Sequence, residues 1–335
     1  MNKEYVMALL AEINDENSGR DLVSAGAVRE VGVHDGTVNV DIRLGYPLAD
    51  EGKDLAASIK TQLENNAEID QATVHVSSKV VPHKVQEDLK PLPSIANIIA
   101  VGSGKGGVGK SSTAVNLALA LKAQGAKVGL LDADIYGPSI PSMLGVSGQP
   151  ATDGEHIIPK EAHGLKVMSI GFLVDEESAM IWRGPMVTSA LQQLLGDTAW
   201  GPLDYLVIDL PPGTGDIQLT LAQKIPVAGA VFVTTPQDIA LLDARRAINM
   251  FRKVDVPVLG VVENMSTHIC SACGHEEAIF GHGGGEQMAK DFDLPLLGRL
   301  PLSLEIRAAL DEGTPTVIKD ADSPVAKAYA SMALK

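Results

Sequence analysis

The sequence of 335 residues predicts an α/β fold, with a doubly wound, mostly parallel sheet after residue 95 and a small α+β domain before it. Short, continuous apolar runs recur after residue 95, which is typical of parallel strands that are covered on both faces. Segments with helical spacing separate these runs, and this alternation is the pattern of a doubly wound sheet. A glycine-rich segment, SGKGGVGKSS at residues 103–112, follows the first run.

The composition describes a folded protein and excludes several classes. Hydrophobic residues make up 45% of the chain and charged residues 21%, which is typical of a globular protein. The formal net charge of −15 disfavours nucleic acid and anionic membranes as partners. No apolar run approaches the roughly 18 residues of a membrane span, and the N-terminus lacks the features of a signal peptide. We therefore expect a cytoplasmic protein with no membrane or nucleic-acid partner.

Residues 1–81 predict the small α+β domain. Asp35-Gly36 marks a hairpin turn between two β-prone runs. The expected elements are a strand at 23–33, a strand at 37–44, a helix at 55–65 and a strand at 72–81. Residues 82–94 are rich in proline and charged side chains, which predicts a linker. The larger domain then occupies residues 95–335.

The larger domain is expected to contain six strands and at least three helices. The apolar runs predict strands at 97–103, 127–134, 166–173, 204–211, 229–236 and 257–265, and helical spacing predicts helices at 186–195 and 239–253. Residues 115–125 alternate leucine with small residues, as a strand would. Alanine is a strong helix former, however, and Gly125 suits the end of a helix. We therefore expect a helix there that is buried on more than one side.

Residues 104–111 match the phosphate-loop pattern G-x-x-x-x-G-K-[ST], between a predicted strand and a predicted helix. Glycines let backbone N–H groups converge on phosphate oxygens, and the helix N-terminus adds partial positive charge. We expect Lys110 to lie between the β- and γ-phosphates of ATP and Ser111 to bind Mg²⁺. A glycine-rich turn that binds nothing is the alternative. The expected nucleotide contacts are Gly104, Lys105, Gly106, Gly107, Val108, Gly109, Lys110, Ser111 and Ser112.

Three aspartates lie at the ends of apolar strands. Asp209 ends the run YLVID, where a carboxylate can hold Mg²⁺ through water. A helix cap or a turn residue is the alternative role. Asp132 and Asp134 end another strand, and either carboxylate could polarise the water that attacks ATP. The alternative for this pair is two solvated side chains.

Lys105 is a second lysine in a loop that ordinarily needs one. GKGGVGKS resembles the deviant Walker A motif of the ATPase group that includes nitrogenase iron protein and the septum-placing and plasmid-partitioning ATPases. The resemblance implies that Lys105 reaches across a dimer interface to the partner's nucleotide, as an arginine finger does. It also implies a homodimer that encloses ATP.

The only two cysteines, Cys270 and Cys273, form a C-x-x-C motif in a polar segment after a strand. This spacing favours metal ligation, and a thioredoxin-like redox pair would require a different fold. Two thiolates cannot complete a four-cysteine site for zinc or an iron–sulfur cluster, but two copies across a two-fold axis can. His268, His275 and His282 are nearby, and we expect them to be surface histidines; the alternative is that they tune the metal site. The glycine-rich segment GHGGG at 281–285 lacks the lysine of a phosphate loop, so a flexible loop before a helix is expected.

The larger domain is similar to the Mrp (ApbC-type) iron–sulfur cluster carrier proteins over about residues 95–318. The resemblance rests on these segments, in the family's order: IWRGPM, LDYLVIDLPPGTGD, VTTPQDIALLDA, GVVENMS, CSACGH and LLGRLPL. Residues 1–81 resemble the small MIP18-like domain that many bacterial members carry. Stand-alone relatives of that domain often have a cysteine before a proline. This chain has Tyr46-Pro47 there, so we expect no metal ligand in the N-terminal domain.

The resemblance implies a role for each residue of the nucleotide site. Asp134 would lie in a first switch segment and orient the attacking water. Asp209 would be the Mg²⁺-binding carboxylate at the start of a second switch segment. Asn264 would contact the adenine ring. Asp243 would pair with Lys105 when no partner is docked.

The resulting hypothesis is a cytoplasmic, homodimeric ATPase of the P-loop NTPase type, with ATP and Mg²⁺ as cofactors and slow turnover. Cys270 and Cys273 would bind a labile [4Fe–4S] cluster that bridges two protomers and passes to apo-proteins. Three alternatives are an ATPase with a structural zinc bridge, a spatial regulator similar to MinD or ParA, and a redox partner similar to nitrogenase iron protein. The alanine-rich C-terminal segment lacks the strong apolar face of a membrane-docking helix, which disfavours the second. Single, widely separated cysteines would be expected for the third.

Overall fold

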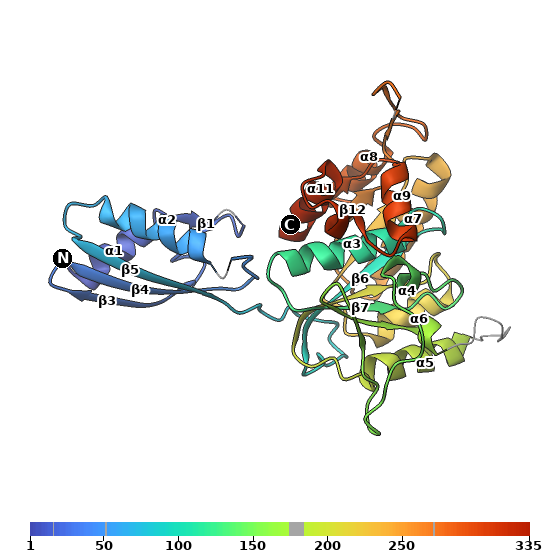
Figure 1. Cartoon of the computed structure of the whole chain (residues 1–335), viewed down its shortest axis with the longest axis horizontal. Coiled ribbons are helices and arrows are strands. Elements are labelled where there is room, and N and C mark those ends of the chain that lie inside the picture. The colour runs from blue at the N-terminus through green and yellow to red at the C-terminus, as the bar shows by residue number, and fades with distance from the viewer. Residues whose placement is uncertain (16, 51, 174–183, 271) are drawn as a thin grey trace. The chain divides into compact units, whose positions relative to one another are not determined.

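The computed structural model describes residues 1–15, 17–50, 52–173, 184–270 and 272–335, which form two compact units (Figure 1). The smaller unit consists mainly of residues 1–81 and the larger one mainly of residues 82–333. Within the segment IWRGPM, residues 181–183 lie outside the described residues, as does Ser271 between the two cysteines. In the described ranges, no helix combines the length and the apolar character needed to cross a membrane.

The smaller unit is a three-stranded sheet covered by helices. Its elements are α1 (Lys3–Leu10), β1 (Asn14–Asp15), β2 (Arg20–Asp21), β3 (Val28–His34), β4 (Thr37–Leu44), α2 (Lys53–Glu64) and β5 (Gln71–Ser78). The central strand β4 pairs antiparallel with β3 and parallel with β5. Asp35 and Gly36 have φ angles of 44° and 77°, as a tight turn of the primed type requires. One cluster of buried apolar side chains joins the helices to the sheet.

The strand that was expected at 23–33 begins only at Val28. The carboxylate of Asp21 accepts hydrogen bonds from the backbone N–H groups of Val23 at 2.9 Å and Ser24 at 2.7 Å. This bonding folds the backbone after Asp21 into a turn, because a short polar side chain offers local backbone groups an alternative to a strand ladder. At the Tyr46-Pro47 position, the Tyr46 hydroxyl donates a hydrogen bond of 2.5 Å to the buried carboxylate of Asp15.

The larger unit contains an eight-stranded sheet with the order β15-β12-β11-β6-β10-β7-β9-β8. Its strands are β6 (Ile95–Ser103), β7 (Val128–Asp132), β8 (Lys160–Ala162), β9 (Leu165–Ser169), β10 (Leu203–Asp209), β11 (Gly229–Thr234), β12 (Val258–Glu263) and β15 (Leu296–Arg299). All neighbouring pairs are parallel except β8 with β9. The six apolar runs supply β6, β7, β9, β10, β11 and β12, and the doubly wound, mostly parallel sheet is confirmed. The short edge strands β8 and β15 were not expected.

Helices cover both faces of this sheet, and Figure 1 shows α3 on one side of β6 and β7 and α5 and α6 on the other. The helices are α3 (Lys110–Ala123), α4 (Ile140–Met143), α5 (Gly184–Gly196), α6 (Asp216–Lys224), α7 (Asp238–Lys253), α8 (Gly284–Asp291), α9 (Leu304–Asp311), α10 (Thr316–Lys319) and α11 (Pro324–Leu334), with a short 3₁₀ helix at Ile170–Phe172. In α3 every residue from 113 to 121 is buried, which confirms a helix enclosed on more than one side. Gly125 has a φ of 91° just beyond it.

The strand order positions the site. After β6 the chain first forms β7 on one side of β6 in the sheet, and it later forms β11, β12 and β15 on the other side. The strand order therefore reverses beside β6. Ligands of doubly wound sheets bind at such a reversal, outside the carboxyl ends of the strands. Parallel register places Asp209 of β10 opposite Asp132 of β7 and Val101 of β6. The carboxyl ends of three central strands therefore meet at one place.

Candidate functional site

The phosphate loop joins β6 to α3 and depends on its glycines. Gly107 and Gly109 have φ angles of 81° and 86°, a region that side chains other than glycine rarely adopt. Gly104 packs so closely on α7 that a Cβ there would overlap the backbone of Asp243 and Ala244. The loop is thus held in position by a helix that is distant in sequence, and any side chain at Gly104 must displace it.

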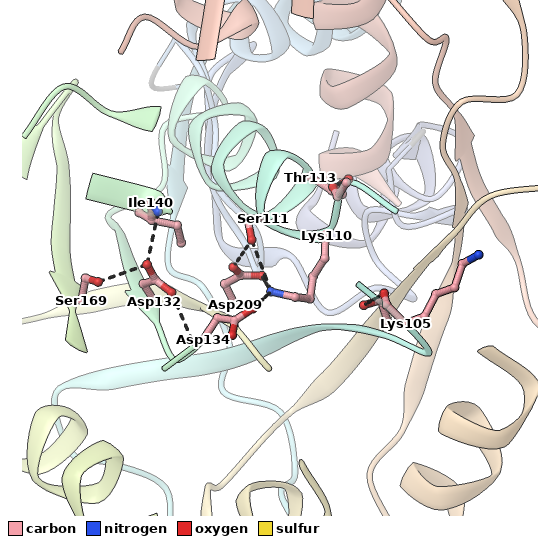
Figure 2. A network of polar contacts seen from close by, with 11 residues as sticks. Lys105, Lys110, Ser111, Thr113, Asp132, Asp134, Ile140, Ser169 and Asp209 are labelled. Carbon is pink, nitrogen blue, oxygen red and sulfur yellow. Dashed lines mark hydrogen bonds and ion pairs between the residues drawn. The ribbon is translucent and has the colours of Figure 1, made fainter. Parts of the chain in front are cut away.

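Lys110, Ser111, Asp134 and Asp209 converge at the start of α3 (Figure 2). The ammonium Nζ of Lys110 lies 2.7 Å from Oδ1 of Asp209 and 3.4 Å from Oδ2 of Asp134. The Ser111 hydroxyl donates a hydrogen bond of 2.5 Å to the other carboxylate oxygen of Asp209. The residues that the sequence assigned to phosphate, Mg²⁺ and water are therefore in direct contact.

The charged side chains of this cluster are largely removed from water, whereas Ser111 is partly exposed. Asp209 is fully buried, and Lys110 is 6% exposed. Burial raises the pKa of the Asp209 carboxyl, while the Lys110 ammonium and hydrogen bonds from Lys110 and Ser111 act in the opposite direction. A buried charge without a partner is strongly destabilising. Lys110 and Ser111 are consequently tied to the end of β10.

The structure separates the roles of Asp132 and Asp134. Asp132 is fully buried and accepts hydrogen bonds from the N–H groups of Asp134 and Ile140 and from the Ser169 hydroxyl, at 3.1, 3.2 and 3.1 Å. Both of its carboxylate oxygens are engaged in holding the segment after β7. Asp134, by contrast, presents its carboxylate to Lys110. Of the two, Asp134 is the one placed to act on a ligand at the loop.

Lys105 points away from this cluster, as Figure 2 shows. Its Nζ donates a hydrogen bond of 3.4 Å to Oε1 of Gln237, just before α7. The predicted pairing of Lys105 with Asp243 is wrong, because Asp243 instead pairs with Arg246 at 3.2 Å, one turn along α7. Partners three residues apart face each other on a helix, so Asp243 is satisfied within its own element.

A cavity of about 590 Å³ opens beside the phosphate loop. Its wall includes Gly107, Gly109 and Ser112 from the loop and α3, and residues of α9 and α11. Asn264 also lines it, and the Asn264 amide donates a hydrogen bond of 2.9 Å to the carbonyl of Val108. Gly109 faces Asn264 so closely that a Cβ at Gly109 would overlap the Asn264 amide. The cavity therefore lies where a base would follow phosphates held by the loop.

The two cysteines lie in a hairpin formed by β13 (His268–Ile269) and β14 (Glu276–Glu277), which we call the cysteine hairpin (residues 268–270 and 272–279 of the described chain). The Cys270 N–H donates to the carbonyl of His275 at 2.9 Å, and the Gly274 N–H donates to the carbonyl of Cys270 at 2.8 Å. Gly274 has a φ of 71°. Cys270 is partly exposed and Cys273 is exposed.

This turn favours thiolate at Cys270. Hydrogen bonds from the backbone N–H groups of Ala272 and Cys273 to its sulfur lower the pKa of the Cys270 thiol. Thiolate is the form that binds metals. Across the described ranges, no three His, Cys, Asp or Glu side chains come together as a set able to hold a metal ion. Two thiols of one chain thus offer half of a four-coordinate site.

The neighbouring histidines differ from one another. His275 and His282 are exposed, as expected. His268 was expected at the surface, but it is partly buried, its Nδ1 is shielded from solvent, and its side chain lines the cavity. Segments that are distant in sequence form this cavity, and such a cavity leaves no local pattern in the sequence. The sequence therefore could not show that His268 and Ile279 line it.

Glu263, at the end of β12, was also missed. It is 2% exposed and accepts hydrogen bonds from the Ser266 hydroxyl at 2.8 Å and the Gly285 N–H at 2.5 Å. A Cβ at Gly285 would overlap the Glu263 side chain, which accounts for a glycine there. The segment GHGGG leads directly into α8 at Gly284, as expected for a loop that precedes a helix.

Comparison with known proteins places this site in a family. The profile described as NUBPL iron-transfer P-loop NTPase matches residues 94–335, and one described as iron–sulfur cluster assembly protein matches residues 3–76. The chain belongs to the iron-transfer P-loop NTPase family. A relative from Haemophilus influenzae named iron–sulfur cluster carrier protein is 50% identical over 335 residues, spanning 99% of this chain and 90% of the relative.

Solved structures agree with this iron-transfer P-loop NTPase fold. A nucleotide-binding protein from Archaeoglobus fulgidus, in complex with ADP, is 39% identical with a TM-score of 0.61, covering 69% of this chain and 90% of that one. The cell division ATPase MinD from Pyrococcus furiosus is 25% identical with a TM-score of 0.55, covering 71% and 96%. The family resemblance that the motifs predicted is confirmed.

Replacing Gly104 should weaken nucleotide binding. Gly104→Ala forces the loop off α7, so we expect the affinity for MgADP to fall at least about tenfold, or about 1.4 kcal/mol, in isothermal titration calorimetry. Gly196→Ala, at the end of α5, introduces the same methyl group where no atom lies within 4 Å. That control should bind as the wild type does. Equal affinities for both variants would contradict the close-packing argument.

Asp132 should make stability depend on pH. Burial, together with the charge of Asp209, raises the pKa of Asp132 from 3.8 to about 7. The folded protein therefore holds a proton that the unfolded chain releases near pH 4, and the contribution of Asp132 to the free energy of unfolding falls as pH rises toward 7.

Asp132→Asn removes this titration. Between about pH 5 and pH 7, urea unfolding should show the variant gaining stability relative to the wild type by up to about 1.4 kcal/mol per pH unit. The difference should level off above pH 7. A difference that does not change with pH would rule out a raised pKa at Asp132.

Proposed function

We propose that this protein is an ATP-dependent carrier that binds a [4Fe–4S] cluster as cargo between two copies of the chain and transfers it to apo-proteins in the cytoplasm. The observation that carries the proposal is a pair of thiols, one exposed and one partly exposed, in a turn whose N–H groups favour thiolate, on a chain with a complete phosphate loop. Relatives named iron–sulfur cluster carrier protein support it. We assign residues 1–81 to the MIP18-like domain, 82–94 to the linker and 95–335 to the ATPase domain.

The chain's own residues divide the work on ATP. N–H groups from Gly104 to Ser112 surround the phosphates, and Lys110 exchanges its carboxylate partners for the β- and γ-phosphates. That exchange releases Ser111 and Asp209, which would hold Mg²⁺; the ion would supply positive charge beside the phosphates. Asp134 accepts a hydrogen bond from the attacking water and orients it. Asn264 contacts the adenine in the adjoining cavity.

The exchange of partners gives a reason for slow turnover. Lys110 must leave a buried carboxylate at 2.7 Å before it can serve the phosphates. Breaking a buried ion pair is costly unless each charge finds a new partner. Binding of nucleotide together with Mg²⁺ supplies both partners at once, so the site responds to the complex as a switch.

The cargo site is completed by a second chain. Two thiolates from Cys270 and Cys273 and two from a second copy make the four ligands of a [4Fe–4S] cluster. Lys105 supports the same dimer, because its side chain is directed away from its own phosphate site. There it makes a hydrogen bond of 3.4 Å to Gln237, which it would exchange for the partner's phosphates. ATP enclosed between the copies would then change how tightly the cluster is held.

A zinc bridge is the second candidate, since four thiolates also suit Zn²⁺ and the hairpin turn favours either metal. Anaerobically purified protein distinguishes the two. The carrier should contain about two iron and about two sulfide ions per chain, absorb broadly near ~400 nm and have the mass of a dimer. A colourless protein with about half a zinc ion per chain would remove the carrier function.

Cys270→Ala should abolish iron and sulfide binding and leave MgADP binding intact, because the cysteine contributes nothing to the phosphate loop. His275→Ala, on the same exposed turn, should retain the cluster. Both are measured by metal analysis and calorimetry. A Cys270→Ala protein that keeps a full cluster would show that the ligands lie elsewhere.

Lys105→Ala should bind MgADP about as well as the wild type does but fail to dimerise with a non-hydrolysable ATP analogue, since Lys105 is directed out of its own site. Native mass spectrometry measures the change. Lys60→Ala, which removes a lysine from α2 of the smaller unit, serves as the control and should dimerise normally. Dimerisation of the Lys105 variant would exclude its role across the interface.

A further inference from the structure

The cysteine hairpin forms one wall of the cavity beside the phosphate loop. His268 begins the hairpin and Ile279 ends it, and both line the cavity together with Asn264. Cys270 follows His268 by two residues along the chain. The two sites that the family name connects, one for nucleotide and one for metal, therefore share a structural element.

The root of the hairpin is fastened to the segment that precedes α9, which also lines the cavity. The Leu302 N–H donates a hydrogen bond of 2.7 Å to the carbonyl of Thr267, and the Ser266 N–H donates one of 3.0 Å to the carbonyl of Leu300. His268 and Leu302 also form a parallel bridge. Leu302 lines the cavity as well. A molecule in the cavity thus meets both the root of the hairpin and the segment that holds it.

The backbone leading into the hairpin is strained. Met265 has a φ of 56°, in the left-handed region that costs a residue with a side chain about 1 kcal/mol or more. Glu263 offsets this cost, because it accepts the Ser266 hydroxyl and fixes the residue that follows. Strain of this kind persists where the surroundings hold the backbone in place, and Met265 itself lines the cavity.

The outer part of the hairpin has little to hold it. Each of its strands has only two residues, which pair with each other, and beyond that pairing the bridge from His268 to Leu302 lies at the root. Residues 272–278 are all exposed. Isolated hairpins of this size are marginally stable in water. The position of the cysteines is therefore set at the root, where the hairpin meets the cavity.

We propose that nucleotide binding controls the cysteine site through this hairpin. A base that fills the cavity packs against His268 and Ile279, fixes the root and closes the turn around the two thiols. The proposal rests on the proposed function for the ligands of the two sites, but the coupling itself requires no cluster. By linkage, nucleotide and metal then change each other's affinity by the same factor, typically about 5-fold to 150-fold.

Thiol alkylation tests the coupling directly. Cys270 and Cys273 are the only cysteines of the chain, so the rate of reaction with iodoacetamide reports on the hairpin alone. The experiment uses the full chain, reduced and freed of metal with a chelator, with and without saturating MgADP. We expect MgADP to slow alkylation of the wild type at least about fivefold.

Two isoleucines of the hairpin provide a matched pair of variants. Ile279 lines the cavity and is 51% exposed, whereas Ile269 does not line it and is 55% exposed. Ile279→Ala should reduce the slowing by MgADP to less than about twofold, and Ile279→Val should give an intermediate value. Ile269→Ala should slow as the wild type does. Calorimetry sets the MgADP concentration that saturates each variant.

The outcomes separate the coupling from the carrier function. An unchanged alkylation rate in wild type saturated with MgADP overturns the coupling and leaves the carrier proposal to the iron analysis. Equal loss of slowing in Ile279→Ala and Ile269→Ala overturns the route through the cavity wall. Slowing lost only in the Ile279 variants, in a protein that holds zinc and no iron, supports the coupling and removes the cluster as its cargo.

Discussion

The buried carboxylate of Asp209 is the constraint on which the site depends. Its charge at the end of a central strand must be compensated, and Lys110 and Ser111 are the groups that compensate it. This requirement ties the first turn of α3 to β10, while the register of β10 with β7 brings Asp132 alongside. Asp132 in turn holds the segment that carries Asp134. The geometry of the loop, of the segment after β7 and of the sheet edge thus follows from one charge that cannot be left unpaired.

Much of this could be predicted from sequence because its causes are local. Continuous apolar runs predicted the parallel strands, the glycine pattern predicted the phosphate loop, and alanine content identified α3 despite its strand-like alternation. The C-x-x-C motif belongs to the same class, since its turn is built from hydrogen bonds within a few residues. The edge strands β8 and β15 were not predicted, because a strand of three or four residues is too short to show a hydrophobic period.

The remaining features depend on contacts between distant segments. Lys105 bonds to Gln237, and Asp243 pairs with Arg246 on the same helix. Spacing in the sequence alone does not decide which of the available partners each side chain chooses. The cavity draws its walls from the phosphate loop, the segment after β12 and the start of α9. The strand predicted at 23–33 is shorter because the Asp21 carboxylate accepts hydrogen bonds from backbone N–H groups. Those N–H groups would otherwise have bonded to a neighbouring strand. In each case a polar group had two available partners, and tertiary packing selected one.

The bonding of Glu263 has a consequence for how such a protein can be assembled from parts. Ser266 and Gly285 donate hydrogen bonds to opposite oxygens of the same carboxylate. The segment that carries the cysteines therefore begins and ends beside one side chain, that of Glu263. Its strands pair with no strand of the main sheet. Segments whose two ends lie together at a surface are the places where insertions are tolerated. The cysteine hairpin is therefore modular: a nucleotide-binding scaffold could acquire, exchange or lose it without rebuilding its sheet.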